Sequence, residues 1–432
     1  MLLSIILERI RLNNYIRSIL AILSGTAVAQ IISLAILPIL TRLYTPEDFS
    51  VLALYTAIFS ILSGIVCLRF DVAIPLPKED SKALDLMTLS VCCSLFTSLV
   101  VQLLLIIFSD DILKGTSLPG FTIYFIPMAI FSYGIFSTLQ YWCSRKKDFK
   151  VIAHTRVVQS VSGNIIQLAG GVLGVKFLLL VGQWVTTSAG IFSLLKHVAH
   201  LKDEFKTRIS IKRLKSTIVE YKHYPQFSTF ESLANNAGAY IPIILLATYS
   251  ENTEAGLLLL SMRVMQAPLN LIGSSVAQVF YSHAATKNQR GELGSLTKST
   301  LTGLMKVGVG PIIFVGILSP YLFSFIFGSG WEEAGEIIQI MAAWYVFQFL
   351  ASPISMVLHI KKKQIQMLML TVFGAVFRII SIIIALAYYS EYVLWVFSMS
   401  GALFYLTCLF VFSVNSLDSK LEFVEVLKDS CI

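Results

Sequence analysis

Long apolar stretches, separated by short polar segments, occupy nearly the whole chain. Crossing the hydrocarbon core of a bilayer takes about 20 consecutive apolar residues in a helix. By this measure the pattern predicts twelve transmembrane helices, with short loops and no separate soluble domain. The predicted spans are residues 18–41, 49–68, 84–108, 120–143, 153–174, 177–197, 227–249, 255–280, 298–328, 335–358, 365–388 and 391–415.

The composition agrees with this pattern. Of the 432 residues, 56% are hydrophobic and only 13% are charged, whereas a soluble domain carries about 25% charged residues. The expected fold class is therefore an all-α integral membrane protein. The six cysteines lie in apolar segments or at predicted cytoplasmic ends, without the spacing of a metal site. We expect free thiols and no metal site.

Basic residues fall mostly on one side of the predicted membrane. Of the 33 Lys and Arg residues, 26 fall in one set of loops, 3 in the opposite set and 4 within spans. Because Lys and Arg accumulate in cytoplasmic loops, both termini are predicted to be cytoplasmic. The net charge of +8 then reflects topology and contact with anionic membrane lipids, which argues against a nucleic-acid partner.

The two halves of the chain share a weak repeat. "TPEDFSVLALY" before the second span resembles "ENTEAGLLLL" before the eighth, and "SRKKDF" after the fourth resembles "IKKKQI" after the tenth. Two repeats of equal orientation predict two six-helix bundles with a substrate site between them. The expected parts are a cytoplasmic interfacial segment (1–17), an N-terminal bundle (18–198), a basic cytoplasmic linker (199–225), a C-terminal bundle (226–415) and a cytoplasmic tail (416–432).

Four cations lie within the predicted spans. Arg263 and Lys306 lie about 12 Å along their helices, near the middle of the bilayer, and Arg378 lies about 20 Å along its helix. Arg156 is only one turn inside and is expected to reach back to the cytoplasmic surface. A charge in hydrocarbon is costly unless it faces a partner or a watery cavity, and carboxylates at this depth are scarce. Arg263 and Lys306 are therefore expected to line a cavity that receives an anion.

Polar residues recur at helical spacing in several spans. Arg263, Gln266 and Asn270 share one face of the eighth span, and Glu231 and Asn235 share one face of the seventh. Such stripes either line a cavity or hold neighbouring helices together by hydrogen bonds. Both interpretations stay open for two further stripes, which are Thr26, Gln30 and Ser33 in the first span and Arg156, Ser160, Asn164 and Gln167 in the fifth.

Several segments resemble one known family. "RLYTPEDFSVLALY" followed by "LRFDVAIPLPKED" resembles the amino-terminal signature of bacterial polysaccharide-biosynthesis flippases, and "YWCSRKKDFKVIAHTRVVQSVSGNIIQLAGG" resembles the region around their fourth and fifth helices. "YPQFSTFESLANNAGAYIPIILL", "LLLLSMRVMQAPLNLIGSSVAQVFY" and "FGSGWEEAGEIIQIMAAW" resemble their second half. The resemblance covers nearly the whole chain in the family's order. It is specific to the family but not to one sugar.

The resemblance implies the fold of the multidrug/oligosaccharidyl-lipid/polysaccharide exporter superfamily. This MATE-like fold has two six-helix bundles around a V-shaped central cavity and works by alternating access. The Wzx-type O-antigen branch moves an undecaprenyl-diphosphate-linked oligosaccharide across the inner membrane. The resemblance implies no cofactor, H⁺ or Na⁺ as candidate coupling ions, and a polysaccharide polymerase and a chain-length regulator as candidate partners. Glu231 departs from the family pattern, which has an apolar or small residue there.

In that setting, "LRFDVAIPLPKED" (68–80) places Arg69 and Asp71 at the cytoplasmic end of the second span. A guanidinium forks onto phosphate oxygens, so Arg69 is a candidate to engage the arriving diphosphate. Asp71 is expected either to pair with Arg69 or to pair with another helix end as a gate latch. The alternative is an ordinary interfacial ion pair, with the two prolines simply ending the helix.

The expected function is that of a flippase and not of an enzyme. The sequence has no GxxxxGK[ST] loop, HExxH motif or serine elbow, and its longest predicted external loop has about eleven residues. Two other classes of membrane protein are alternatives to the flippase. An integral-membrane polymerase or glycosyltransferase needs catalytic groups on a larger external loop, and a drug exporter of the same superfold favours deep carboxylates over deep cations.

Overall fold

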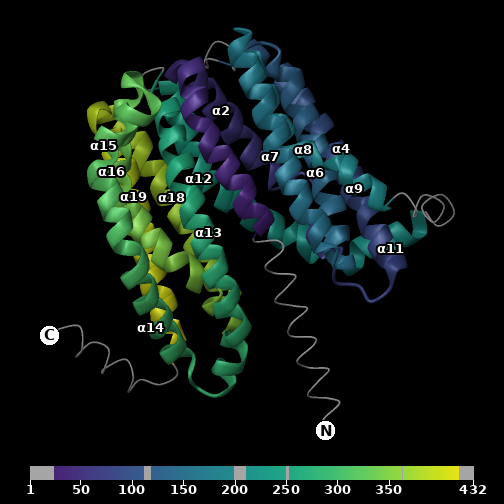
Figure 1. Cartoon of the computed structure of the whole chain (residues 1–432). Helices are drawn as coiled ribbons and strands as arrows, with labels where there is room; N and C mark the ends of the chain where they lie inside the picture. The colour runs from purple at the N-terminus through teal and green to yellow at the C-terminus, as the bar shows by residue number, and fades with distance from the viewer. Residues whose placement is uncertain (1–23, 111–117, 199–210, 250–252, 362, 418–432) are drawn as a thin grey trace. The chain divides into compact units, whose positions relative to one another are not determined.

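The computed structural model describes residues 24–110, 118–198, 211–249, 253–361 and 363–417, and these ranges contain helices and turns but no strand (Figure 1). The predicted interfacial segment at 1–17 and nearly all of the predicted tail lie outside the described residues. The chain divides into two compact units, Met1–Thr248 and Tyr249–Ile432. The five domain ranges expected from the sequence stay a prediction.

Unit 1 is built around α6, which packs against α2, α4, α8 and α9, while α7 packs along α8. Its last helix, α12, ends one residue past the unit boundary. The described elements are a first helix at Ser24–Leu43, α2 (Pro46–Ser63), α3 (Phe70–Ala73), α4 (Asp80–Ile107), α6 (Thr122–Lys146), α7 (Phe149–Val172), α8 (Phe177–Ser188), α9 (Gly190–Val198), α11 (Ile211–Glu220), η2 (Tyr224–Ser228) and α12 (Thr229–Tyr249).

Unit 2 is built around α16, which packs against α13, α15 and α19, while α18 packs along α19. Its elements are α13 (Glu254–Gln289), α14 (Leu293–Leu304), η3 (Met305–Val309), α15 (Gly310–Phe327), η4 (Ser329–Trp331), α16 (Glu332–Ala351), η5 (Ser352–Ile354), α17 (Val357–Ile360), α18 (Gln364–Tyr388), η6 (Ser390–Tyr392) and α19 (Val393–Ser416). The predicted span 298–328 is thus a composite of α14, the π-helical η3 and α15.

Nine helices in the described ranges are long and apolar enough to cross a membrane. Three further long helices, α2, α7 and α12, lie in the three remaining predicted spans but are not apolar enough to meet this criterion, so the number twelve stays a prediction. Large apolar side chains remain exposed on the outer helices, including Phe96 (66%) on α4 and Phe325 (83%) on α15. Such extensive apolar exposure suits contact with lipid, so the chain is a multi-pass membrane protein.

The second span differs from its predicted range of 49–68. It begins earlier, at Pro46, because Thr45 accepts a hydrogen bond from the Asp48 backbone N–H while the Asp48 side chain accepts one from the Thr45 backbone N–H. It also ends earlier, at Ser63, because the chain then turns through residues 64–69 before the short helix α3. The motif "TPED" is therefore a helix start, and the charged motif that follows lies beyond the helix end.

Candidate substrate-binding site

Arg145 at the end of α6 fixes the turn that follows α3. Its guanidinium donates to the carbonyl oxygens of Ile74 (3.5 Å), Pro75 (3.5 Å), Pro77 and Lys78 (3.1 Å), and to Asp80 Oδ1 (2.9 Å from Nη2). The Arg145 side chain is only 9% exposed, whereas Asp80 is about half exposed. A single buried arginine therefore holds the "PLPKED" part of the charged motif against "SRKK".

Further ion pairs join this region to the basic linker. Lys146 Nζ lies 2.6 Å from Asp80 Oδ2 on α4. On the linker helix α11, Arg213 Nη2 lies 2.9 Å from Asp85 Oδ2, and Glu220 Oε2 lies 3.1 Å from Lys82 Nζ. Three segments that are far apart in the sequence, the turn after α3, the end of α6 and α11, thus meet at one end of unit 1.

The backbone that carries Arg69 is unusual. Leu68 (φ 47°) and Arg69 (φ 62°) both have the left-handed backbone conformation, which residues other than glycine rarely adopt. The turn is closed by hydrogen bonds from Leu68 N–H to the Ile65 carbonyl (2.9 Å) and from Phe70 N–H to the Cys67 carbonyl (3.1 Å). Strained residues of this kind persist where surrounding structure holds them, and they gather at binding and switch sites.

Asp71 is bound to α6. Its carboxylate is buried (6% exposed) and accepts a hydrogen bond from the Ser137 hydroxyl at 2.6 Å. Burial raises the pKa of Asp71 above its usual value, although the Ser137 hydrogen bond and the Arg69 charge act in the opposite direction. Within the described residues no ion pair joins Asp71 to Arg69, and neither Asp71 Oδ1 nor Arg69 Nε has a hydrogen-bond partner.

Arg156 of α7 approaches the same face of α6. Its Nη2 donates to Gln140 Oε1 at 3.4 Å. Residues 133, 137, 140 and 141 form one continuous face of α6 at helical spacing. Both tyrosines on this face, Tyr133 and Tyr141, interact electrostatically with Asp71 and Arg156. The structure therefore brings together three residues expected from the sequence, Arg69, Asp71 and Arg156, around one polar face of α6.

Uncharged polar residues of the fifth span form hydrogen bonds with the first span and with α8. Ser33 Oγ lies 2.9 Å from Ser160 Oγ, and Ser160 also donates to the Ala29 carbonyl at 2.8 Å. Asn164 Nδ2 donates to Ser33 (3.4 Å) and Ser160 (3.3 Å), and Gln167 Nε2 donates to the Leu179 carbonyl (3.2 Å). For these residues the structure selects helix–helix adhesion over cavity lining.

The remaining expected residues are spread over four elements. Arg263, Gln266 and Asn270 lie on one face of the continuous helix α13, where Arg263 and Gln266 are half-buried and Asn270 is exposed. Lys306 is exposed and lies in the π-helical turn η3. On α12, Glu231 is half-buried and Asn235 is exposed. The cavity expected for Arg263 and Lys306 stays a prediction.

Arg378 has aromatic neighbours. Its guanidinium lies over the Trp344 ring of α16 (4.7 Å to the centroid) and over the Phe404 ring of α19 (5.4 Å), and it is 6% exposed. Aromatic faces attract a cation, most strongly where water is excluded. This arrangement stabilises the packing of α18 on α16 and α19 and leaves little of Arg378 accessible.

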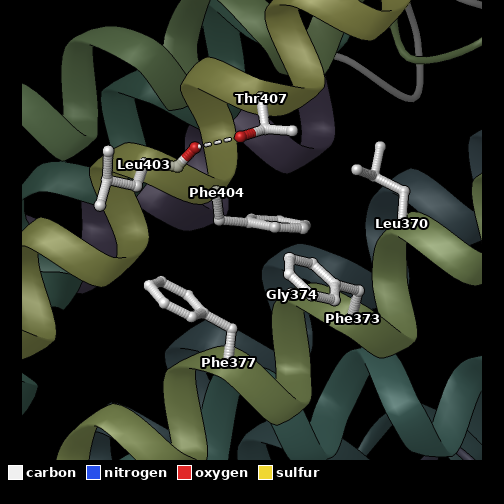
Figure 2. A pocket seen from close by; sticks show the side chains of 7 residues that line it. All are labelled: Leu370, Phe373, Gly374, Phe377, Leu403, Phe404 and Thr407. Atoms are coloured by element: carbon white, nitrogen blue, oxygen red, sulfur yellow. Dashed lines mark hydrogen bonds between the residues drawn. The ribbon is translucent and has the colours of Figure 1, made fainter.

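A groove of about 140 Å³ lies on unit 2 between α18 and α19 (Figure 2). Phe404 lies in it against Gly374, where any larger residue would clash with the ring. Its single polar side chain, Thr407, donates its hydroxyl hydrogen to the Leu403 carbonyl at 2.8 Å. The groove therefore offers apolar contacts but no polar group for a sugar or a phosphate. Its lining residues are Leu370, Phe373, Gly374, Phe377, Leu403, Phe404 and Thr407.

Three residues of the α6 region were not expected from the sequence. Arg145 stood in the motif "SRKKDF", where it was counted only as a topology charge. Ser137 and Gln140 carried a detectable signal, because they lie three residues apart on the buried side of α6. Across the described ranges, no three His, Cys, Asp or Glu side chains are grouped to hold a metal ion.

The sequence profile of a family described as "Polysaccharide biosynthesis protein" matches residues 39–336. Comparison with curated proteins finds no match. Among solved structures, the lipid II flippase MurJ in an inward closed conformation superposes with a TM-score of 0.67 at 17% identity, covering 96% of this chain and 93% of that one.

A multidrug resistance MATE family transporter of the MOP superfamily, in an inward-facing conformation, superposes with a TM-score of 0.60 at 12% identity. The superposition covers 91% of this chain and 94% of that one. At such identities the likeness establishes the fold, which is the MATE-like fold expected from the sequence. Since the profile covers more than half of its length, the chain belongs to the polysaccharide biosynthesis protein family.

Proposed function

We propose that this protein is a flippase that moves an undecaprenyl-diphosphate-linked oligosaccharide, the repeat unit of O-antigen or a related surface polysaccharide, across the bacterial inner membrane. The family match supports a role in making polysaccharide, and the likeness to MurJ and MATE transporters supports alternating access. The observation that carries the proposal is the meeting of Arg69 and Arg156 around the polar face of α6.

The two arginines suit a diphosphate headgroup. A guanidinium presents its N–H groups in a planar fork that matches phosphate oxygens. Arg69 Nε has no hydrogen-bond partner in the described residues, so it retains a donor for a ligand. Arg145 holds the adjoining turn in place. Arg69 therefore loses less conformational entropy when the headgroup binds.

In the second unit, the α13 face is proposed to bind the diphosphate midway through transport. Arg263, Gln266 and Asn270 follow one another along this face, and Lys306 is proposed to add a second positive charge. Glu231 and Asn235 on α12 are proposed to contact the sugar. Arg378 remains a weaker candidate, because its guanidinium is enclosed by two aromatic rings.

Both termini are proposed to lie in the cytoplasm, with H⁺ or Na⁺ as the coupling ion and no cofactor. Asp71 is the candidate for proton coupling in unit 1, since it is a buried carboxylate on the polar face of α6. A polysaccharide polymerase and a chain-length regulator are proposed partners. The protein is proposed to catalyse no covalent step, in keeping with the transport activity named for the proteins that share its fold.

The second candidate function is export of a drug or another small molecule, which the likeness to MATE transporters favours. One experiment separates the two. Wild-type protein is expressed in a strain that lacks its own flippase for the cognate polysaccharide, and surface polysaccharide is measured beside membrane abundance. Restored polysaccharide supports the flippase, whereas drug resistance without polysaccharide supports the exporter.

Charge substitutions then test the diphosphate. Arg263→Gln and Lys306→Gln are expected to lose most of the surface polysaccharide at normal abundance, because the substrate loses a cationic partner in the membrane. Arg263→Lys is expected to keep part of it, since it retains the charge but not the fork. Normal export by both glutamine variants at normal abundance would exclude this mechanism.

A further inference from the structure

The first half of α12 is weakly held in the fold. No residue from Phe230 to Ala237 is buried, whereas Gly238, Pro242, Ile243 and Leu246 in the second half are. No described element packs extensively along α12. A helix segment with few buried contacts opens at little free-energy cost.

The segment contacts the end of α2 through a few residues. Asn236 Nδ2 donates to the Ser60 carbonyl at 2.9 Å, and this carbonyl also accepts from the Ser63 hydroxyl at 3.1 Å. Gly64 faces the same place. A Cβ on Gly64 would clash with the Asn236 amide and would lie 2.7 Å from Ser232 Oγ. Glycine at this position therefore permits the close approach of α12 to α2.

Each end of the segment carries a feature that weakens a helix. It is preceded by the π-helical turn η2, with Pro225 in its first turn, and it is followed by Pro242 inside α12. π-turns mark hinges, and a proline in a helix removes one backbone hydrogen bond and kinks it. The weakly packed stretch is thus bounded by two positions at which a helix bends at low free-energy cost.

The segment also adjoins the candidate site. Gly64 precedes Arg69 by five residues on the same turn. The helix α3, which carries Asp71, is in contact with η2 at the start of α12. The segment therefore adjoins, through Gly64 and through the contact of α3 with η2, the turn that carries Arg69 and Asp71.

We propose that residues 230–237 form a gate, which is closed against Ser60 and Gly64 in the present conformation and swings away from α2 at another stage of transport. The inference rests on the proposed function, since only a transporter with alternating access needs the movement. It assigns roles to Gly64, Ser232 and Asn236, none of which was expected to bind substrate.

A reversible cross-link tests the gate. In a disulfide, the Cβ of one cysteine lies about 3 Å from the Sγ of the other, which matches the approach of position 64 to the Ser232 side chain. We expect Gly64→Cys/Ser232→Cys to cross-link in a strain with an oxidising cytoplasm, when made in a chain whose six native cysteines are replaced by alanine. Asn236→Ala is included in this chain, because it removes the amide that a Cβ at position 64 would meet. Surface polysaccharide should then fall to background. In an ordinary reducing strain the same variant should export more than in the oxidising strain, whereas export by Ser232→Cys alone should be equal in the two strains.

Two outcomes of this test overturn the gate. One is full export by the cross-linked protein, which means that α12 need not leave α2. The other is failure of folded, membrane-inserted protein to cross-link, which means that positions 64 and 232 do not meet. Failure of the wild-type chain to export polysaccharide counts instead against the proposed function.

A thiol-labelling measurement tests the gate even if the wild-type chain does not export polysaccharide. Reaction of Ser232→Cys with N-ethylmaleimide should become roughly two- to tenfold faster when Asn236→Ala is added, because one hydrogen bond no longer holds the gate closed. Asn235→Cys is the matched control, since Asn235 is already exposed and its labelling rate should not change. An unchanged rate at position 232 overturns the gate whatever the substrate is.

Discussion

The arginine side chains of the two units have different kinds of neighbour. In unit 1, Arg145 donates to four backbone carbonyls and to Asp80, and Arg156 donates to Gln140, so polar partners surround the charges. In unit 2, Arg378 lies between the rings of Trp344 and Phe404. A cation bound to polar groups can exchange them for a ligand, whereas contacts with aromatic rings add to the packing of helices. The difference favours the α6 region as the first binding site.

The largest effect is expected from Arg145→Ala. It leaves four carbonyl oxygens and Asp80 without their shared donor, which should lower the free energy of unfolding by about 3 kcal/mol, somewhat less than a fully buried pair because Asp80 is half exposed. The melting temperature of solubilised protein and its membrane abundance measure the loss. Lys150→Ala is the control, since it removes one exposed charge from the first turn of α7, close in sequence to Arg145. Equal effects of both substitutions would show that Arg145 is only a topology charge.

The next effect concerns Asp71, which was expected to pair with Arg69 or with another helix end. The structure instead gives it a hydrogen bond from Ser137. A double-mutant cycle with Asp71→Asn and Ser137→Ala should show a coupling of roughly 1.5–3 kcal/mol in unfolding, whereas Asp71→Asn and Arg69→Gln should be nearly additive. Strong coupling of Asp71 to Arg69, without coupling to Ser137, would instead indicate an ion pair between Asp71 and Arg69.

The same carboxylate predicts a dependence on pH. Burial raises the folded-state pKa of Asp71, so its contribution to stability is complete at low pH and is lost as the pH rises through that value. Ser137→Ala removes a group that lowers this pKa, so the folded-state pKa should rise further and the loss of stability with increasing pH should extend to a higher pH than in the wild type. Asp71→Asn should abolish this part of the dependence, as measured by melting temperature across a pH series.

Arg378→Gln sharpens the comparison between the units. Loss of two cation–ring contacts should lower the free energy of unfolding by about 2 kcal/mol, with export falling only as far as membrane abundance falls. Arg156→Gln in unit 1 should show the reverse pattern, with normal abundance and reduced export. Export per molecule, taken as surface polysaccharide divided by membrane abundance, measures both. Reduced export per molecule in Arg378→Gln would place this arginine in the transport path.

The smallest effect compares the starts of the two repeats. Thr45 caps α2 with a full capping box, whereas Thr253 precedes α13 without a side-chain cap. Thr45→Ala should therefore cost about 1 kcal/mol of stability, and Thr253→Ala close to none. Melting temperatures of the two variants measure this difference. Equal losses would mean that the second repeat also depends on its threonine.

The membrane fold was predictable because its signal is local and large. A run of about 20 apolar residues predicts a span without any knowledge of its neighbours. The ends of the second span were less predictable, because the left-handed conformations of Leu68 and Arg69 depend on packing and not on a glycine or proline at those positions. The polar stripe shared by Ser160 and Asn164 was visible, but its partner Ser33 lies 127 residues from Ser160.

The sequence by itself determined the all-helical membrane architecture, the family, and the presence of cations within the spans, since each follows from residue type and spacing. Only the tertiary structure decided which charges meet. Arg145 was brought to the "PLPKED" turn and Ser137 to Asp71 by the packing of α6 against α3 and α4. Arg378 was enclosed by Trp344 and Phe404 through the packing of three helices. Hydrogen bonds and cation–ring contacts act over a few ångströms, so they depend on helix packing that no local pattern specifies.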